Sequence, residues 1–212
     1  MTTTISGAKI VLPANSLSNA DLATNADIAT SKIAQRVLAE YPLPLTSGRT
    51  WDNMAVNLPL TPATDDLGLL TGTLGTDWLT IESGDLKAAG ATSRIVAFEW
   101  PVPPHYDDGA TIQCRIRAGM ETNVADASAT IDLVVWKPNG EGLISGADLC
   151  TTAAQSHNSL TLANLDFVLD AANIDPGDLL QLTITMAIND AATGTAVTGV
   201  ITDVRMMLDT RG

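Results

Sequence analysis

The residue types that perform acid–base, nucleophilic or metal chemistry are few in this chain, and none has a catalytic spacing. There are two histidines, His105 and His157, and two cysteines, Cys114 and Cys150. No His-Glu-x-x-His, Gly-x-Ser-x-Gly or Gly-x-x-x-x-Gly-Lys motif occurs. The cysteines are too few for a disulfide framework and lack the spacing of a zinc site, so we expect reduced, partly buried thiols. The sequence therefore predicts a protein that is not an enzyme, with no catalytic residue, no metal site and no cofactor.

Carboxylates are numerous, yet their arrangement is typical of turns. Nineteen of the 24 acidic residues are aspartate, which favours turns and strand ends. The doublets Asp65-Asp66 and Asp107-Asp108 offer oxygen ligands for Ca²⁺, but no spaced ligand series like that of an EF-hand accompanies either doublet. The carboxylate pair of a glycosidase cannot be recognised by spacing among so many aspartates. We therefore expect turns at both doublets.

The four tryptophans offer a second kind of binding chemistry. Trp51, Trp78, Trp100 and Trp136 are spread along the chain. Exposed indole rings would form a platform for sugars. The alternative, which we expect, is that they pack in the core or at a subunit interface.

The charge balance excludes several classes of protein. The 212 residues contain 11 Lys and Arg against 24 Asp and Glu, a net charge of −13 at pH 7. Such a chain is repelled by phosphate, so we expect no nucleic-acid partner. No run of 18 apolar residues is present, which argues against a membrane span, and the first residues do not read as a secretory signal.

From residue 43 onward the sequence has the period-two alternation of β-strands. Residues 111–118 place Ile112, Cys114, Ile116 and Ala118 on one face and polar side chains on the other. The same alternation puts Leu180, Leu182, Ile184, Met186 and Ile188 on one face of 180–188, and Val200, Thr202, Val204, Met206 and Leu208 on one face of 200–208. Further strands are expected near 56–60, 67–72, 77–82, 93–102, 129–136 and 160–169.

Turn residues separate these strands. Asn-Gly at 139–140 accepts the positive φ of a tight turn, and Asp-Asp-Gly at 107–109 and Asp-Pro-Gly-Asp at 175–178 are turn sequences that precede strands. Eight or nine strands with no long helix predict an all-β fold, a jelly-roll-type two-sheet β-sandwich over residues 43–212. Spacing alone leaves an immunoglobulin-like sandwich open as the alternative.

Residues 1–42 differ from the rest and are predicted to form an N-terminal arm. A tandem hexapeptide, NADLAT then NADIAT, occupies residues 19–30, and residues 9–13 are apolar enough to pair as an extended strand. Residues 30–40 predict a short helix that ends at Tyr41-Pro42. A helix of that length is marginal alone, and the arm has no second layer to cover its apolar residues. The arm must therefore pack on its own domain, associate with copies of itself, or dock on a partner.

A resemblance to a known family rests on two segments. Residues 17–33, LSNADLATNADIATSKI, resemble the "NADIA…sKI" segments of tailed-phage fibre and head-decoration proteins. Residues 96–118, VAFEWPVPPHYDDGATIQCRIRA, resemble the "f.lP..Y..G..i.lri.a" stretch of jelly-roll phage virion proteins, and residues 174–180 and 188–190 fit the same pattern. The resemblance implies a homotrimer on the virion with an N-terminal anchor and a C-terminal β knob. It carries over no catalytic residue.

These observations predict a capsid decoration (cement) protein on the capsid surface of a virion. Residues 1–42 would clamp neighbouring copies of the major capsid protein, and the β domain would trimerise and project outward. The expected anchoring contacts are the apolar residues Ile10, Val11, Leu12, Leu22, Ile28, Ile33 and Val37.

Two alternatives remain open. The first is a head or tail fibre tip that binds host-surface glycans through loops around His105, Tyr106, Trp51 or Trp136. The second, from another class, is a carbohydrate-active enzyme or its binding module. Against the second stand the missing secretion signal and the missing catalytic motif.

Overall fold

A computed structural model describes residues 36–71, 77–88, 90–138, 144–145, 147–191 and 194–211. The tandem hexapeptide, the extended segment at 9–13 and the Asn-Gly turn at 139–140 lie outside the described residues. No helix in the described part of the chain is long and apolar enough to cross a membrane.

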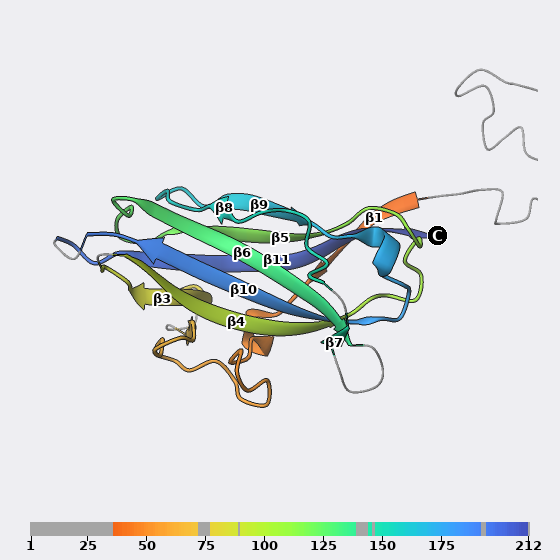
Figure 1. Ribbon diagram of the computed structural model, residues 1–212, viewed down its shortest axis with the longest axis horizontal. Coiled ribbons are helices and arrows are strands. Elements are labelled where there is room, and N and C mark those ends of the chain that lie inside the picture. Colours follow the sequence, from red (N-terminus) through yellow and green to blue (C-terminus); the bar gives the residue numbers. More distant parts are fainter. Residues whose placement is uncertain are drawn as a thin grey trace, which may run out of the picture. The chain divides into compact units, whose positions relative to one another are not determined.

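The described residues form two antiparallel sheets packed as a sandwich (Figure 1). The first sheet has the order β2 (Gly68–Leu70), β3 (Thr80–Asp85), β11 (Thr198–Arg211), β5 (Ile112–Met120) and β9 (Ala163–Val168), and β1 (Arg36–Pro42) also pairs with β11. The second has the order β4 (Ala91–Pro101), β10 (Leu179–Asn189), β6 (Ser128–Pro138) and β7 (Ile144–Ser145), and β8 (Gln155–Ser156) also pairs with β6. Short 3₁₀ turns, η3 (Leu45–Ser47) and η4 (Ala171–Asn173), lie in the connections.

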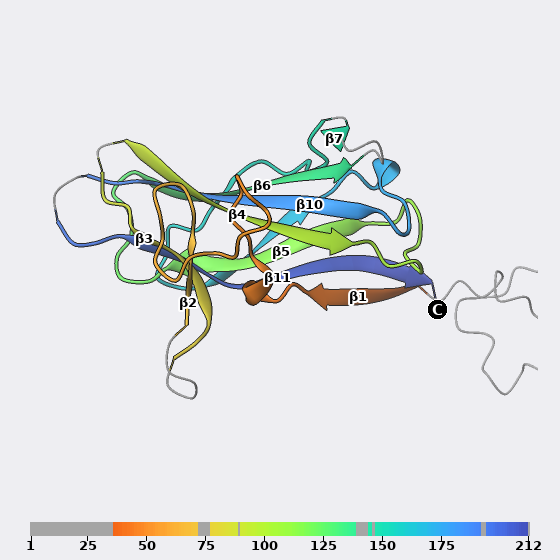
Figure 2. The ribbon, with the colours of Figure 1, turned by 90° about the horizontal axis from the view of Figure 1, so that it is seen from below.

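The strand order identifies the architecture. Four strands of the first sheet run β3-β11-β5-β9, and the facing four run β4-β10-β6-β8, so the chain crosses repeatedly from one sheet to the other. Figure 2 shows β4, β10 and β6 as one layer and β5, β11 and β1 as the other. This interleaving is that of a jelly roll, which confirms the predicted all-β, two-sheet sandwich.

The core forms where the alternating apolar residues of both sheets meet. Every apolar residue predicted to face inward in 112–118 and 180–188 is fully buried. Both cysteines are free thiols. Cys150 is partly buried, as expected, whereas Cys114 is fully buried in this core. Burial raises the pKa of the Cys114 thiol well above its usual range and that of Cys150 to about 11. Both thiols are therefore mostly protonated at neutral pH, and the thiolate is the nucleophilic form.

The alternation predicted for 200–208 is interrupted by a β-bulge. The register of β11 against β5 shifts between Ile201 and Asp203, so Ile201 and Val204 are both fully buried. Thr202 and Asp203 lie between them and are partly exposed. The strict alternation is thus wrong at the start of this strand. A bulge inserts one unpaired residue and re-aims its neighbours, and here it leaves two consecutive polar residues out of the core.

Two predicted elements are corrected. No strand forms at 56–60, where Asn57 makes only a single bridge to Arg49. Pro59 has no backbone N–H to donate to a ladder, which explains the failure. The helix predicted for 30–40 is wrong over residues 36–40, because these residues belong to β1 and pair antiparallel with β11, with Val37 opposite Thr210.

The cause of the second correction is the length of β11. This strand has 14 residues, and β3 covers its edge only up to Ile201. The rest of that edge pairs with β1, which outweighs a weak local helix preference. The pairing joins residues 36–42 to the β domain by hydrogen bonds. The division of roles between an anchoring arm and a β domain stays a prediction.

Two of the predicted turns have the required glycine geometry. Gly109 and Gly177 have φ of +74° and +90°. In the second turn the backbone N–H of Asp178 donates to the carbonyl of Asp175 at 3.1 Å. Proline followed by a positive-φ glycine inside such a hydrogen bond is a type II turn, which fixes the entry to β10.

Candidate functional site

Of the seven predicted anchoring residues, the structure describes one, Val37 in β1. Its side chain is 53% exposed, and its carbonyl accepts a hydrogen bond from the Thr210 hydroxyl at 3.1 Å. The neighbouring Leu38 is 56% exposed and was not among the predicted contacts. The other six, Ile10, Val11, Leu12, Leu22, Ile28 and Ile33, lie outside the described residues.

β1 is an open edge of the first sheet. Within the described residues it pairs only with β11, so one side of the strand has no backbone partner there. β1 is the first strand of the described chain. Two of its apolar side chains, Val37 and Leu38, are exposed. Open edges with exposed apolar side chains are sites at which another chain can add.

Arg205 ties β1 to β11 through two ion pairs. Its guanidinium lies 2.7 Å from a carboxylate oxygen of Glu40 in β1 and 2.6 Å from one of Asp203 in β11. Asp203, and then Glu40, hold the pKa of the Arg205 guanidinium above its ordinary value. One cation therefore balances two carboxylates, one in each strand.

Replacing Arg205 by leucine should loosen β1. All three groups are about a third exposed, so the loss of unfolding free energy should be only about 1 kcal/mol or less. The local effect should be larger: backbone amides of 36–42 should exchange faster by hydrogen–deuterium exchange. Arg117→Leu is the matched control, because the Arg117 side chain makes no hydrogen bond or ion pair within the described structure. Equal exchange rates in both variants would contradict the anchoring role of Arg205.

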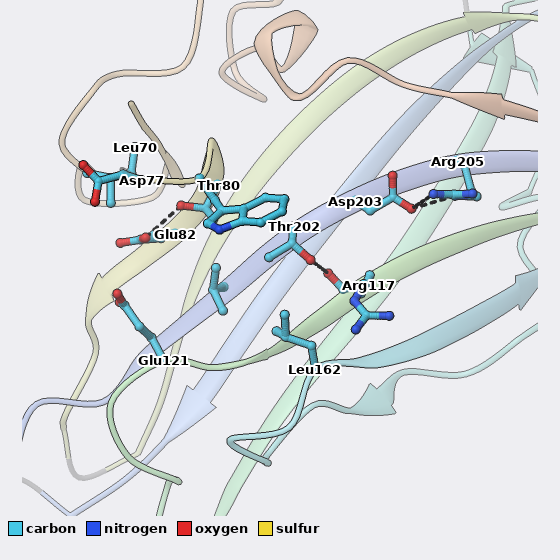
Figure 3. A pocket seen from close by; sticks show the side chains of 12 residues that line it. Leu70, Asp77, Thr80, Glu82, Arg117, Glu121, Leu162, Thr202, Asp203 and Arg205 are labelled. Atoms are coloured by element: carbon cyan, nitrogen blue, oxygen red, sulfur yellow. Dashed lines mark hydrogen bonds and ion pairs between the residues drawn. The ribbon is translucent and has the colours of Figure 1, made fainter. Parts of the chain in front are cut away.

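A hollow lined by both apolar and charged residues lies on the first sheet. It has a volume of about 860 Å³ and is lined by residues of β2, β3, β5 and β11 and of the segments beside them. Figure 3 shows Glu82 and Glu121 toward one end and Arg117, Asp203 and Arg205 toward the other. We call this hollow the outer groove; its lining residues are Leu70, Asp77, Trp78, Thr80, Glu82, Arg117, Glu121, Leu162, Val200, Thr202, Asp203 and Arg205.

Apolar surface in the outer groove is dominated by Trp78. This side chain is 86% exposed, the highest value among the large exposed apolar residues of the described chain. Leu70 is 43% exposed, whereas Val200 is buried. An indole with nearly all of its surface in water is available to a ligand without any rearrangement of the core.

The polar groups of the groove are held by local contacts. The Thr80 hydroxyl donates to a carboxylate oxygen of Glu82 at 2.9 Å. Burial raises the pKa of Glu82, the Thr80 hydrogen bond opposes this, and the nearby Glu121 raises it further. The Thr202 hydroxyl, which the bulge in β11 places in the groove, donates to the carbonyl of Arg117 at 3.4 Å.

The tryptophans divide into different environments. Trp100 is buried, and its ring lies 6.0 Å from that of Tyr41. Trp136 is half-buried, whereas Trp51 is 45% exposed and donates from its indole N–H to Asp65 at 3.4 Å. Core packing is thus right for Trp100, whereas Trp51 and Trp78 lie outside the core, and packing at a subunit interface stays a prediction for them. No local pattern distinguished Trp78, because its exposure depends on what the rest of the sheet leaves uncovered.

The loop residues that would bind glycans in a fibre tip make contacts with different partners. Tyr106 is buried and donates from its hydroxyl to the carbonyl of Ala110 at 2.6 Å. His105 is exposed, and its Nε2 lies 2.8 Å from the hydroxyl of Tyr41. Trp51 pairs with Asp65, as described above. Nothing in the described structure joins these residues into one pocket.

The acidic doublets have other surroundings. Asp107 is buried and forms an ion pair with Arg211. Asp66 is also buried; desolvation, and then the charges of Asp65 and Asp52, raise its pKa. Within the part of the chain that the structure describes, no three His, Cys, Asp or Glu side chains are grouped to hold a metal ion.

Three comparisons with known proteins give matches among solved structures alone. No protein-family model matches the chain, and no curated protein matches it in sequence. A structure of infectious bursal disease virus, Gx strain, aligns with 10% identity and a TM-score of 0.44 over 84% of this chain and 33% of the viral chain. This chain therefore spans about a third of that one.

Carbohydrate-binding modules align similarly. A family 28 module specific for non-crystalline cellulose aligns with 16% identity and a TM-score of 0.43, over 68% of this chain and 82% of the module. A family 15 xylan-binding module aligns with 14% identity and a TM-score of 0.43, over 84% of this chain and 99% of the module.

Proposed function

We propose that the chain is a virion structural protein of the capsid decoration type. Residues 1–35 bind the major capsid protein on the outer shell, and the β domain forms a homotrimer that projects outward. The proposal rests on the phage-like sequence of residues 17–33 together with one structural observation. That observation is the open edge of β1, where the exposed Val37 and Leu38 directly follow the proposed arm.

Charge distribution supports this division of labour. Residues 1–35 carry Lys9 and Lys32 against Asp21 and Asp27, so the arm is neutral and the whole net charge of −13 belongs to residues 36–212. A neutral segment lies on a protein surface without a penalty from like charges, and an acidic domain stays soluble. An arm of this length is able to bury on the order of 1,000 Å², enough for a specific interface, and three arms would add avidity.

Deleting residues 1–35 should abolish capsid binding and leave the β domain folded. The cut must stop before Arg36, because removal of β1 would also expose the edge of β11. Binding is measured by cosedimentation with capsids stripped of the protein, and folding by circular dichroism and thermal unfolding. Wild-type binding by the truncated chain would contradict the proposed anchor.

Point variants in the full chain give a sharper test. Ile28→Asp places a charge at a predicted contact and should weaken binding at least about tenfold, as expected for an apolar anchor in an interface. Asn25→Asp introduces the same charge three residues away at a polar position and should bind nearly as wild type. Equal loss in both variants would point to general electrostatics rather than to apolar contacts.

The fibre-tip alternative shares the fold and the attachment. The copy number and position of the chain in purified particles separate the two roles. A decoration protein is present in many copies over the whole shell, whereas a fibre tip occurs in few copies at defined vertices.

A further inference from the structure

The outer groove has no part in the anchoring proposed above. The lining residues that the structure describes all belong to the β domain. Its most unusual feature is Trp78, which is 86% exposed although tryptophan is among the most apolar of large side chains. The groove and the exposed indole are independent observations. Together they define a place where a ligand would contact an aromatic ring inside a hollow of the surface.

The charged lining argues against a protein segment as the occupant. Six of the twelve lining residues are Asp, Glu or Arg, and the groove-facing carboxylates approach one another closely enough for Glu121 to affect Glu82. The centres of protein–protein interfaces are depleted of charged residues. The volume of about 860 Å³ instead falls in the range of small-ligand sites, roughly 300–1,000 Å³.

The sign of the charge limits the ligand further. Four carboxylates and two guanidinium groups line the groove, and the guanidinium of Arg205 is already shared between Asp203 and Glu40. Arg117 alone has a guanidinium without a side-chain partner in the described structure. The groove is therefore net negative, and an anionic ligand would be repelled.

We propose that the outer groove binds a neutral saccharide. The face of Trp78 stacks on the C–H face of a pyranose ring, which is apolar, while the ring's hydroxyl groups stay available for hydrogen bonds. Glu82 and Glu121 accept hydrogen bonds from sugar hydroxyls at one end of the groove, and Arg117 donates to sugar oxygens further along (Figure 3). Hydrogen bonds to charged groups are stronger than those between neutral groups, so these residues orient the ring that Trp78 holds.

The full-length protein is tested first against an array of oligosaccharides. The probes are neutral hexamers of β-linked glucose, xylose, mannose and N-acetylglucosamine, with sialylated and sulfated glycans of similar length beside them. We expect binding to at least one neutral probe, confirmed by titration calorimetry, and none to the anionic glycans. Absence of binding to every neutral probe at millimolar concentration, or preference for the anionic glycans, would overturn the proposal.

Paired tryptophan variants locate the site. Trp78→Ala should weaken binding of the neutral probe roughly tenfold or more, since stacking on one aromatic ring contributes of that order. Trp51→Ala removes another exposed indole, one that lies outside the groove, and should bind as wild type. Because Trp78 is so exposed, its replacement should leave the thermal unfolding midpoint unchanged, which separates lost binding from lost folding.

Two further results distinguish the saccharide site from other roles. Glu82→Gln keeps the shape of the side chain but removes its charge, and should reduce affinity severalfold through the weaker hydrogen bond. If Trp78→Ala binds the saccharide as well as the wild type, the groove is not the saccharide site. A change of oligomeric state on sedimentation of this variant would also contradict the proposal, because it would place Trp78 at a subunit contact. Whether deletion of residues 1–35 abolishes capsid binding does not affect the saccharide-binding result. Either proposal can therefore be contradicted while the other stands.

Discussion

Replacing Phe167 by alanine should lower the free energy of unfolding by about 4 kcal/mol. Phe167 lies in β9, has no exposed surface, and stands opposite Cys114 of β5. Truncation removes the transfer free energy of the ring and leaves a cavity that a packed sandwich only partly fills. For a domain of this size the midpoint of thermal unfolding should fall by roughly 10 °C.

The adjacent residue provides the control. Val168 follows Phe167 in the same strand, points to the other face and is 42% exposed. Val168→Ala should lower the free energy of unfolding by less than about 1 kcal/mol, because much of the removed side-chain surface is exposed to water in the folded state. The free energy of unfolding of both variants is measured by urea unfolding at one fixed protein concentration. Equal losses in the two variants would mean that β9 does not pack on the core as described.

Lowering the pH from about 6.5 to 4 should destabilise the β domain through His157. This side chain is 2% exposed, and neither ring nitrogen has a hydrogen-bond partner among the described residues. Burial lowers its pKa to about 4 from the ordinary 6.5. The folded state therefore keeps the ring neutral at pH values at which the unfolded chain takes up a proton.

The sign of the effect follows from linkage. The contribution of His157 is complete above pH 6.5, decreases as the unfolded state binds its proton, and levels off below the folded pKa near 4. Over that interval the loss approaches about 3 kcal/mol. Protonation of carboxylates adds to acid unfolding at the lower end, so the comparison with a variant is required to isolate the histidine.

His157→Leu should remove this part of the pH dependence. Leucine fills a similar space without the two unpartnered nitrogens, so the variant should be at least as stable as the wild type at pH 7. The space is limited, because an added Cβ on Gly199 would lie 2.9 Å from Nε2 of the ring, and this makes leucine preferable to a larger residue. The exposed His105, replaced in the same way, is the matched control for the removal of an imidazole ring from the chain.

Local patterns predicted the sandwich well. In β5 and β10 every second residue faces the core. The alternation of apolar and polar residues in the sequence therefore predicts directly which side chains are buried. The turns at Gly109 and Gly177 were equally readable, since a positive φ restricts the residue type. One expected strand does not form, because Pro59 interrupts the apolar residues at 56–60 that predicted it.

The candidate sites were harder to predict because they depend on distant residues. Val37 was selected as an apolar residue of a helix, but it is exposed on a strand whose partner, Thr210, is 173 residues away in the chain. Trp78 was grouped with three other tryptophans, and only the packed sheets distinguish the buried Trp100 from it. The groove also needs Thr202, which faces outward because of a bulge that the alternation did not reveal.

The sequence by itself determined the all-β fold class, the inward faces of the central strands, the positions of several turns and the acidic balance of the β domain. These properties depend on residues one or two positions apart or on composition alone. The tertiary structure decided that residues 36–42 form an edge strand, that β11 is bulged at Thr202, and that Trp78 stands exposed beside a groove. Each of these requires a surface or an edge built from strands far apart in the chain, and so exists only once both sheets have formed.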